Sequence, residues 1–180
     1  MIDRSEAIGY EVALVNTGPG QGVHVPGYRD GQRTLIDDPL FAAELWERVK
    51  AHVPAVYQER PVIGINERLR FLKYSPGDQF QAHKDGEYRR TDGSGQVTKV
   101  TIQFYLNEKC VGGATSFLEE KNLWTGSDFK DSKKVEVNPK VGQVLVFQHD
   151  LVHEGSVVVE GHKYVVRSDI LYGPPIRTVW

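Results

Sequence analysis

The sequence predicts a mainly β protein with one flanking helix, arranged as an antiparallel sandwich or jelly roll. Two observations lead to this prediction. After residue 60, short runs rich in β-branched and aromatic residues are separated by Gly, Asn, Asp and Pro, a pattern typical of antiparallel strands. Before these runs, one stretch has the four-residue spacing of apolar side chains that indicates an amphipathic helix.

The helix is expected over about residues 38–53. Asp38 suits the N-cap, Pro39 suits the first helical position, and Pro54 ends the helix. The apolar residues at four-residue steps are Phe41, Leu45, Val49 and Val53. We expect the face that they form to pack against a sheet.

Alternation along two of the predicted strands separates a core face from a polar face. In the run 100–106 the even-numbered residues are apolar, so they should face the helix. The odd-numbered residues on the opposite face are Thr101, Gln103 and Tyr105. In the run that starts at residue 163, the same alternation places Lys163, Val165, Arg167 and Asp169 on one face. Uncharged polar groups beside two cations and one carboxylate favour a pocket for a polar ligand.

Length and composition indicate a single domain over residues 1–180, since 39% hydrophobic residues suffice for a sizeable core. We divide it into N-terminal helical support over about 1–60 and a jelly-roll core, which carries the motifs, over about 61–175. The net charge is only −2 and the basic residues are scattered, so no nucleic-acid partner is expected.

The cellular setting predicted by the sequence is cytoplasmic, without a membrane partner. The single Cys110 cannot form an internal disulfide. No apolar segment near Met1 resembles a leader, and no apolar run is long enough to span a bilayer. The oligomeric state stays open.

His83, Asp85 and His153 are the candidate metal ligands. Residues i and i+2 of an extended strand project from the same face, so His83 and Asp85 could bind one metal ion together. A histidine from a distant strand would complete the set, and His149 competes with His153 for that position. Two histidines and one carboxylate with open positions opposite are the ligand set of non-haem Fe(II) oxygenases.

Further blocks surround these residues between about Arg68 and Tyr172. They are LKYSPG (72–77), FQAHKDG (80–86), TIQFYLN (101–107), GGATSF (112–117), GQVLVFQH (142–149), HEGS (153–156) and GHKYVVRSDILY (161–172). In this order and spacing the chain resembles the Fe(II)/2-oxoglutarate-dependent dioxygenases, specifically their prolyl 4-hydroxylase-like branch. The resemblance implies a double-stranded β-helix that hydroxylates a substrate while 2-oxoglutarate is decarboxylated to succinate and CO2.

The resemblance also implies roles for individual residues. Fe(II) is the cofactor, with 2-oxoglutarate and O2 as cosubstrates, and ascorbate is left open as an accessory reductant. Lys163 stands ten residues after His153, where the family places the basic residue for the distal C5 carboxylate of 2-oxoglutarate. This spacing favours His153 over His149 as the ligand. Tyr74, nine residues before His83, occupies the position of a tyrosine whose hydroxyl reaches 2-oxoglutarate.

The remaining residues expected at the cosubstrate are Gln103, Tyr105 and Arg167. For Arg167 three roles stay open: the C5 carboxylate, the substrate, or a structural bridge to Asp169. The GGATSF turn is interpreted as backbone geometry near the pocket.

The substrate is expected to be a small molecule or a protein side chain, and no motif indicates proline. Residues 27–30 and Arg33 either gate the site or close a turn; we favour the turn, with Arg33 as the predicted substrate contact. The polar stretch 119–134 either covers the mouth of the site or packs as a surface loop. Two alternatives stay open: a non-catalytic metal- or sugar-binding jelly roll, and a nucleic-acid demethylase, against which the lack of a basic stripe argues.

Overall fold

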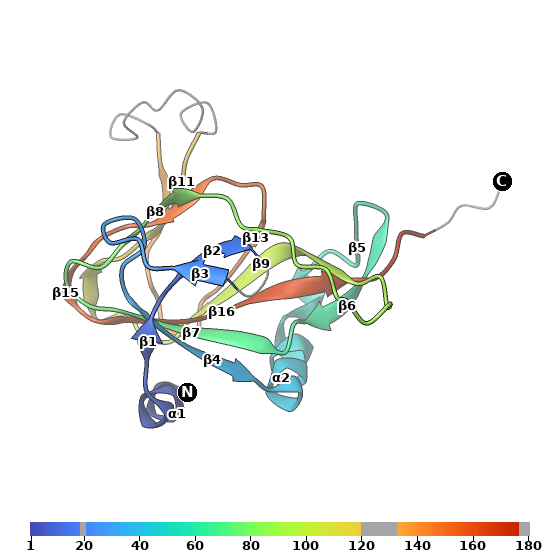
Figure 1. The fold of residues 1–180 in the computed structure, drawn as a ribbon, viewed down its shortest axis with the longest axis horizontal. Helices are drawn as coiled ribbons and strands as arrows, with labels where there is room; N and C mark the ends of the chain where they lie inside the picture. The colour runs from blue at the N-terminus through green and yellow to red at the C-terminus, as the bar shows by residue number, and fades with distance from the viewer. Residues whose placement is uncertain (19–20, 120–132, 177–180) are drawn as a thin grey trace.

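The computed structural model of the chain describes residues 1–18, 21–119 and 133–176 (Figure 1). Its described part is mainly β, with two larger antiparallel sheets, two two-stranded sheets and two α-helices, α1 (Ile2–Ile8) and α2 (Pro39–Val49). The predicted jelly roll is confirmed. Neither described helix is both long and apolar enough to cross a membrane.

The larger sheet is built around its longest strand, β16. Along one edge β16 pairs with β7 and then β6, and along the other edge it pairs with β9, which in turn pairs with β13. The eight strands of this sheet are β1 (Glu11–Val12), β4 (Gln32–Asp37), β5 (Val56–Tyr57), β6 (Arg60–Ile65), β7 (Arg68–Tyr74), β9 (Val97–Tyr105), β13 (Val144–Gln148) and β16 (Lys163–Tyr172). The first sixty residues thus supply strands to the main sheet as well as both helices.

The smaller sheet provides the second wall of the jelly roll. Its strand order is β12 (Val135–Val137), β11 (Thr115–Phe117), β14 (His153–Gly155) and β8 (Phe80–His83). Two two-stranded pairs complete the fold: the hairpin of β2 (Val15–Gly18) with β3 (Gln21–Val23), and the long-range pair of β10 (Cys110–Gly112) with β15 (Val158–Gly161).

Helix α2 begins and packs largely as its sequence predicts. The side chain of Asp38 accepts a hydrogen bond from the backbone N–H of Phe41 at 2.9 Å, which caps the helix before Pro39. The α-helix ends at Val49, four residues earlier than expected, because residues 50–52 tighten into a 3-10 turn. Figure 1 shows α2 against the main sheet near β4 and β6, away from β8 and β11.

The predicted alternation of β9 and β16 separates this helix from the site. Buried side chains of α2 share one apolar cluster with the even-numbered residues Val100, Ile102, Phe104, Val166 and Ile170. The odd-numbered residues therefore point to the opposite face of the sheet, toward the smaller sheet. This arrangement leaves a polar interior between the two sheets.

Candidate active site

His83 and His153 lie opposite each other in the smaller sheet, where β8 and β14 pair. Their ring centroids are 4.3 Å apart. The Nδ1 of His83 donates to the carbonyl of Gln81 at 2.7 Å, and that of His153 donates to the carbonyl of Leu151 at 3.0 Å. Each bond fixes the ring and leaves Nε2 available as a metal ligand.

Asp85 reaches the two histidines by a different route from the predicted one. Strand β8 ends at His83, so the two ligands do not share a strand face. Instead, the backbone N–H of Asp85 donates to the carbonyl of His149 at 2.9 Å. Its carboxylate oxygens lie 3.8 Å from His83 Nε2 and 3.7 Å from His153 Nε2. The three ligand atoms all lie within 4.8 Å of one another, close enough to hold one metal ion.

The protonation states of these side chains suit a metal. Burial, together with the charge of His153, lowers the pKa of His83 to about 3, and burial also lowers the pKa of His153. Both imidazoles are therefore neutral near pH 7, as metal ligation requires. Two imidazole nitrogens and one carboxylate oxygen are the donor set of a non-haem Fe(II) centre, so the residues present fit iron.

Arg167 and Thr101 hold the Asp85 carboxylate. Arg167 Nη2 lies 2.7 Å from Asp85 Oδ1, and the Thr101 hydroxyl donates to Oδ2. Burial alone would raise the pKa of Asp85, but the positive charge of Arg167 keeps that pKa below its usual value. The carboxylate is thus ionised and oriented.

His149, the competing candidate, lies outside this group. Its Nε2 is 3.5 Å from Asp169 Oδ1, in a buried position. Asp169 also pairs with Arg70 at 3.0 Å and with Arg167 at 3.3 Å. The contribution of His149 to the candidate metal site is its backbone carbonyl.

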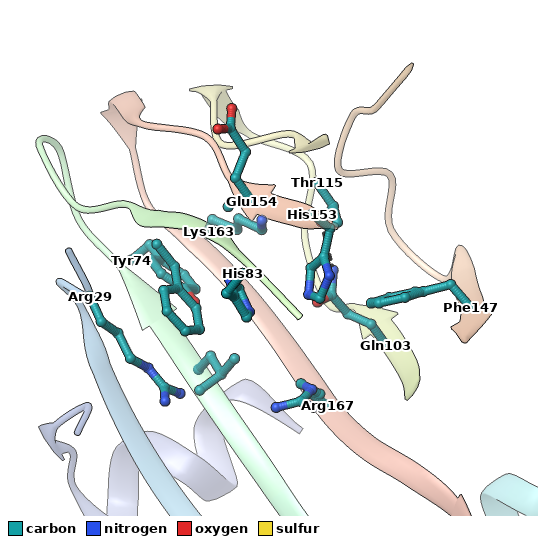
Figure 2. Close-up of a pocket in the computed structure, with 13 residues that line it drawn as sticks. Arg29, Tyr74, His83, Gln103, Thr115, Phe147, His153, Glu154, Lys163 and Arg167 are labelled. Carbon is teal, nitrogen blue, oxygen red and sulfur yellow. Dashed lines mark hydrogen bonds between the residues drawn. The ribbon is translucent and has the colours of Figure 1, made fainter. Parts of the chain in front are cut away.

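A pocket opens between the two sheets beside the three ligands (Figure 2). The main sheet lines it with Leu72, Tyr74, Gln103, Phe147, Lys163 and Arg167, and the smaller sheet lines it with Phe80, His83, Thr115, His153, Glu154 and Gly155. Arg29, from the segment before β4, completes the lining. Four of the residues predicted for the cosubstrate are among them: Tyr74, Gln103, Lys163 and Arg167.

Lys163 lies deep in this pocket. It is 3% exposed and stands opposite Tyr74 where β16 pairs with β7. Its Nζ is 5.4 Å from the centre of the Tyr74 ring and 5.7 Å from that of Tyr105. No carboxylate of the described residues pairs with it, and burial lowers its pKa to about 8. A buried ammonium without an anionic partner is costly, so the position favours an anionic ligand.

Tyr105 lies behind the lining rather than in it. Its hydroxyl donates to Thr115 Oγ1 at 2.8 Å, and Gln103 Nε2 donates to the same oxygen at 3.0 Å. Of these two hydroxyl-bearing residues, Thr115 is the one that lines the pocket. The sequence pattern predicted only backbone geometry for this segment, although Thr115 follows the Gly112-Gly113 turn and lines the pocket.

The Gly112-Gly113 turn allows β10 and β11 to approach β15 and β16. Both glycines have positive φ, 75° and 69°. A Cβ on Gly112 would lie 2.3 Å from the carbonyl oxygen of Val157, and a Cβ on Gly113 would lie 3.3 Å from Lys163 Cδ. The expected backbone role extends to making room for the Lys163 side chain.

Arg29, which precedes β4, and Arg33, which lies within it, differ from their expected roles. The turn at 27–30 forms as predicted, with the Asp30 side chain accepting from the Gly27 N–H at 2.9 Å. Arg29 nevertheless lines the pocket, whereas Arg33 is not among the lining residues and pairs with Glu11 at 3.1 Å. The predicted cover over 119–134 falls mostly on residues 120–132, which lie outside the described residues.

A protein-family model described as the 2OG-Fe(II) oxygenase superfamily matches residues 69–168. Because this match covers more than half of the chain, the chain belongs to that superfamily. No curated protein sequence matches the chain. The chain is thus an oxygenase that uses Fe(II), 2-oxoglutarate and O2, which its His-Asp-His group fits.

Solved structures of prolyl hydroxylases have the same fold. A prolyl hydroxylase from Trichoplax adhaerens, solved with a peptide fragment of the hypoxia inducible factor oxygen degradation domain, matches with a TM-score of 0.66 and 15% identity. This match covers 97% of the present chain and 74% of the other. A Pseudomonas putida prolyl-4-hydroxylase matches with a TM-score of 0.59 and 17% identity, covering 97% and 82%. A collagen prolyl hydroxylase from Paramecium Bursaria Chlorella virus-1 matches with 0.55 and 19%, covering 82% and 81%.

Proposed function

We propose that the chain hydroxylates a C–H bond of a small molecule or a protein side chain, coupled to decarboxylation of 2-oxoglutarate to succinate and CO2. The observation that carries this proposal is the convergence of His83, Asp85 and His153 within 4.8 Å, beside a pocket lined by Lys163, which has no ionic partner among the described residues. The ligand set would hold Fe(II), and the cation would select an anionic cosubstrate.

The three ligands have separate supports, which matters because a metal site needs fixed donors. His83 stacks on Phe80 with ring centroids 3.6 Å apart, and His153 meets Phe147 edge-on at 4.6 Å. These rings, with the carbonyl bonds at Nδ1, hold both Nε2 atoms toward Asp85. Bound iron would supply the O2 chemistry that no side chain can perform.

Lys163 is the proposed partner of the C5 carboxylate of 2-oxoglutarate, with Tyr74 beside it. Arg167 suits this role less well, because its guanidinium already contacts the ligand Asp85 at 2.7 Å. The C5 carboxylate lies at the far end of a five-carbon chain from the atoms that chelate iron. Lys163 stands four residues before Arg167 on β16, away from the Asp85 carboxylate, and is therefore better placed for that end.

Two substrate classes remain within this proposal. The fold shared with prolyl hydroxylases, one of them solved with a peptide fragment, favours a protein side chain. At 15–19% identity, this likeness concerns the fold. A small-molecule substrate is therefore kept as the second class.

The test is an anaerobic titration of the Fe(II)-loaded protein with 2-oxoglutarate, followed by the visible metal-to-ligand absorption band. We expect the band in the wild type and in His149→Ala, and its loss in His153→Ala. Succinate release on adding O2 then measures turnover. A wild-type protein that binds Fe(II) but gives neither the band nor succinate would refute the proposal.

A further inference from the structure

Arg29 is a buried cation in the pocket without an acidic partner. It is 9% exposed, and none of the described carboxylates pairs with it. One nitrogen, Nη1, donates to the carbonyl of Leu14 at 2.7 Å, while Nε is buried and makes no hydrogen bond within the described residues. Burial lowers the pKa of Arg29, and the nearby charges of Arg167 and Arg33 act in the same direction, yet a guanidinium stays charged.

Arg167 has a similar unused donor. Its Nη2 is engaged by Asp85 and Asp169, but its Nε is also buried without a hydrogen-bond partner in the described part of the chain. Figure 2 shows the guanidinium groups of Arg29 and Arg167 on the same side of the His83 and His153 rings, with Lys163 on the other. The pocket thus has a cationic group at each of two ends.

The cosubstrate neutralises the positive charge at only one end of the pocket, the end of Lys163. The charges of Fe(II) and Lys163 together balance the Asp85 carboxylate and the two carboxylates of 2-oxoglutarate. Three arginines remain at the other end: Arg29, Arg70 and Arg167. Among the described residues, Asp169 is the one further carboxylate that pairs with any of them, so their positive charge exceeds the negative charge there. The end of the pocket formed by Arg29 and Arg167, here called the arginine end, therefore retains positive charge that neither the metal nor the cosubstrate neutralises.

The arginine end is also adjacent to the candidate metal site. The guanidinium carbon of Arg29 lies 4.5 Å from the centre of the Phe80 ring, and this ring stacks on His83 at 3.6 Å. An anion held by Arg29 would therefore be separated from the ligand His83 by one aromatic ring. A single small substrate could therefore be anchored at Arg29 by its anionic group and still present a C–H bond to the metal.

We propose that Arg29 and Arg167 bind an anionic group of the substrate, so that the hydroxylated molecule carries a carboxylate or a phosphate close to the reacting carbon. Forked guanidinium donors suit both groups. The inference rests on the proposed function, because it assigns the substrate class of the same site. The shared chemistry is that of a small acid or of an acidic residue in a peptide.

The experiment measures anion binding without turnover. The protein is loaded with Mn(II) in place of Fe(II) and saturated with N-oxalylglycine, which occupies the cosubstrate position. Mn(II) accelerates the nuclear relaxation of any probe held near it, and Zn(II)-loaded protein gives the diamagnetic baseline. The probes are acetate, inorganic phosphate, acetyl-Gly-Glu-Gly-amide and the neutral acetyl-Gly-Gln-Gly-amide.

We expect the Mn(II)-loaded wild type to accelerate the nuclear relaxation of acetate or phosphate. Arg29→Gln should weaken this binding by about 10- to 100-fold, the value of a charge-assisted hydrogen bond. Arg48→Gln is the matched control, because Arg48 is an exposed arginine of α2 paired with Glu44. Since Arg29 also bonds Leu14, the affinity of each variant for N-oxalylglycine checks its integrity. Arg29→Lys, which keeps the charge, should retain part of the binding.

The outcomes separate this inference from the proposed function. If only acetate or phosphate shows accelerated relaxation, the result supports a small acid as the substrate. If the glutamate peptide does so as well, the result supports acidic peptides as substrates too. Equal relaxation of the glutamine peptide, or full relaxation retained in Arg29→Gln, overturns the inference. A wild type that binds Mn(II) and N-oxalylglycine but relaxes no anion also overturns it and leaves the proposed function standing. Failure to bind N-oxalylglycine contradicts the proposed function itself.

Discussion

Arg167 contacts the carboxylate of Asp85 at 2.7 Å and so connects the central strand of the main sheet to a candidate metal ligand that follows the smaller sheet's strand β8. Asp85 lies beyond the end of β8 and depends on such contacts for its position, together with the carbonyl of His149 and the hydroxyl of Thr101. The ligand is thus held by three different elements. This explains how a residue outside a strand can have a fixed carboxylate.

Replacing Asp85 or His153 by Ala should abolish 2-oxoglutarate turnover and leave the fold largely intact. Loss of a direct ligand should weaken metal binding by more than the roughly 10- to 100-fold that loss of an outer partner costs. Metal affinity is measured by titration, and folding by circular dichroism. His149→Ala is the control, since its side chain lies beside Asp169 rather than at the ligands. An inactive His149→Ala beside an active His153→Ala would contradict the assignment.

Lys163→Ala should weaken 2-oxoglutarate binding by about 10- to 100-fold, because a shielded charge-assisted pair is lost. Arg167→Ala should change this affinity less, since Arg167 contacts Asp85 and Asp169 instead. Both are measured by 2-oxoglutarate titration of the Fe(II) protein under anaerobic conditions. A larger loss of affinity in Arg167→Ala than in Lys163→Ala would instead assign Arg167 as the partner of the C5 carboxylate.

The affinity for 2-oxoglutarate should fall as the pH rises above about 8. Burial lowers the pKa of Lys163 to about 8, so the ammonium that attracts the C5 carboxylate is present below this pH and is lost above it. Each further pH unit should then weaken binding by up to about 10-fold. Lys163→Arg stays charged throughout and should show no such fall. The dissociation constant measured from pH 6 to 10 checks this, and an identical fall in both proteins would assign the titration to another group.

The sequence predicted which polar side chains share one face of the main sheet, because strand alternation is a local rule. Strand alternation placed Gln103 and Arg167 on one face, and the structure lines the pocket with both. The spacing of Lys163 from His153 also selected, of two histidines, the one that the structure groups with His83 and Asp85, whereas His149 lies at Asp169.

The sequence could not predict contacts that depend on the approach of distant segments. Asp85 was expected on the strand of His83, but a backbone bond to His149, 64 residues later in the chain, positions it instead. Arg29 was interpreted as part of a turn, because nothing in the local pattern shows that Phe80 would lie beneath its guanidinium. Thr115 was similarly missed, because its pocket position depends on β11 pairing with β14.

Gly113→Ala should weaken 2-oxoglutarate binding by several-fold through Lys163. The new Cβ would lie 3.0 Å from Val158 Cγ2 and 3.3 Å from Lys163 Cδ, so the lysine stem must shift. Positive φ, 69° here, adds a cost of about 1–2 kcal/mol to folding. Gly142→Ala is the matched control, because Gly142 has a φ of 78° but no atom within 4 Å of its added Cβ. Urea unfolding should show that the positive φ lowers the free energy of unfolding by a similar amount in both variants. The close contacts of the new Cβ at residue 113 should lower it further in Gly113→Ala. Titration should show weaker 2-oxoglutarate binding in Gly113→Ala alone, and equal affinities in the two variants would show that Lys163 does not depend on this close approach.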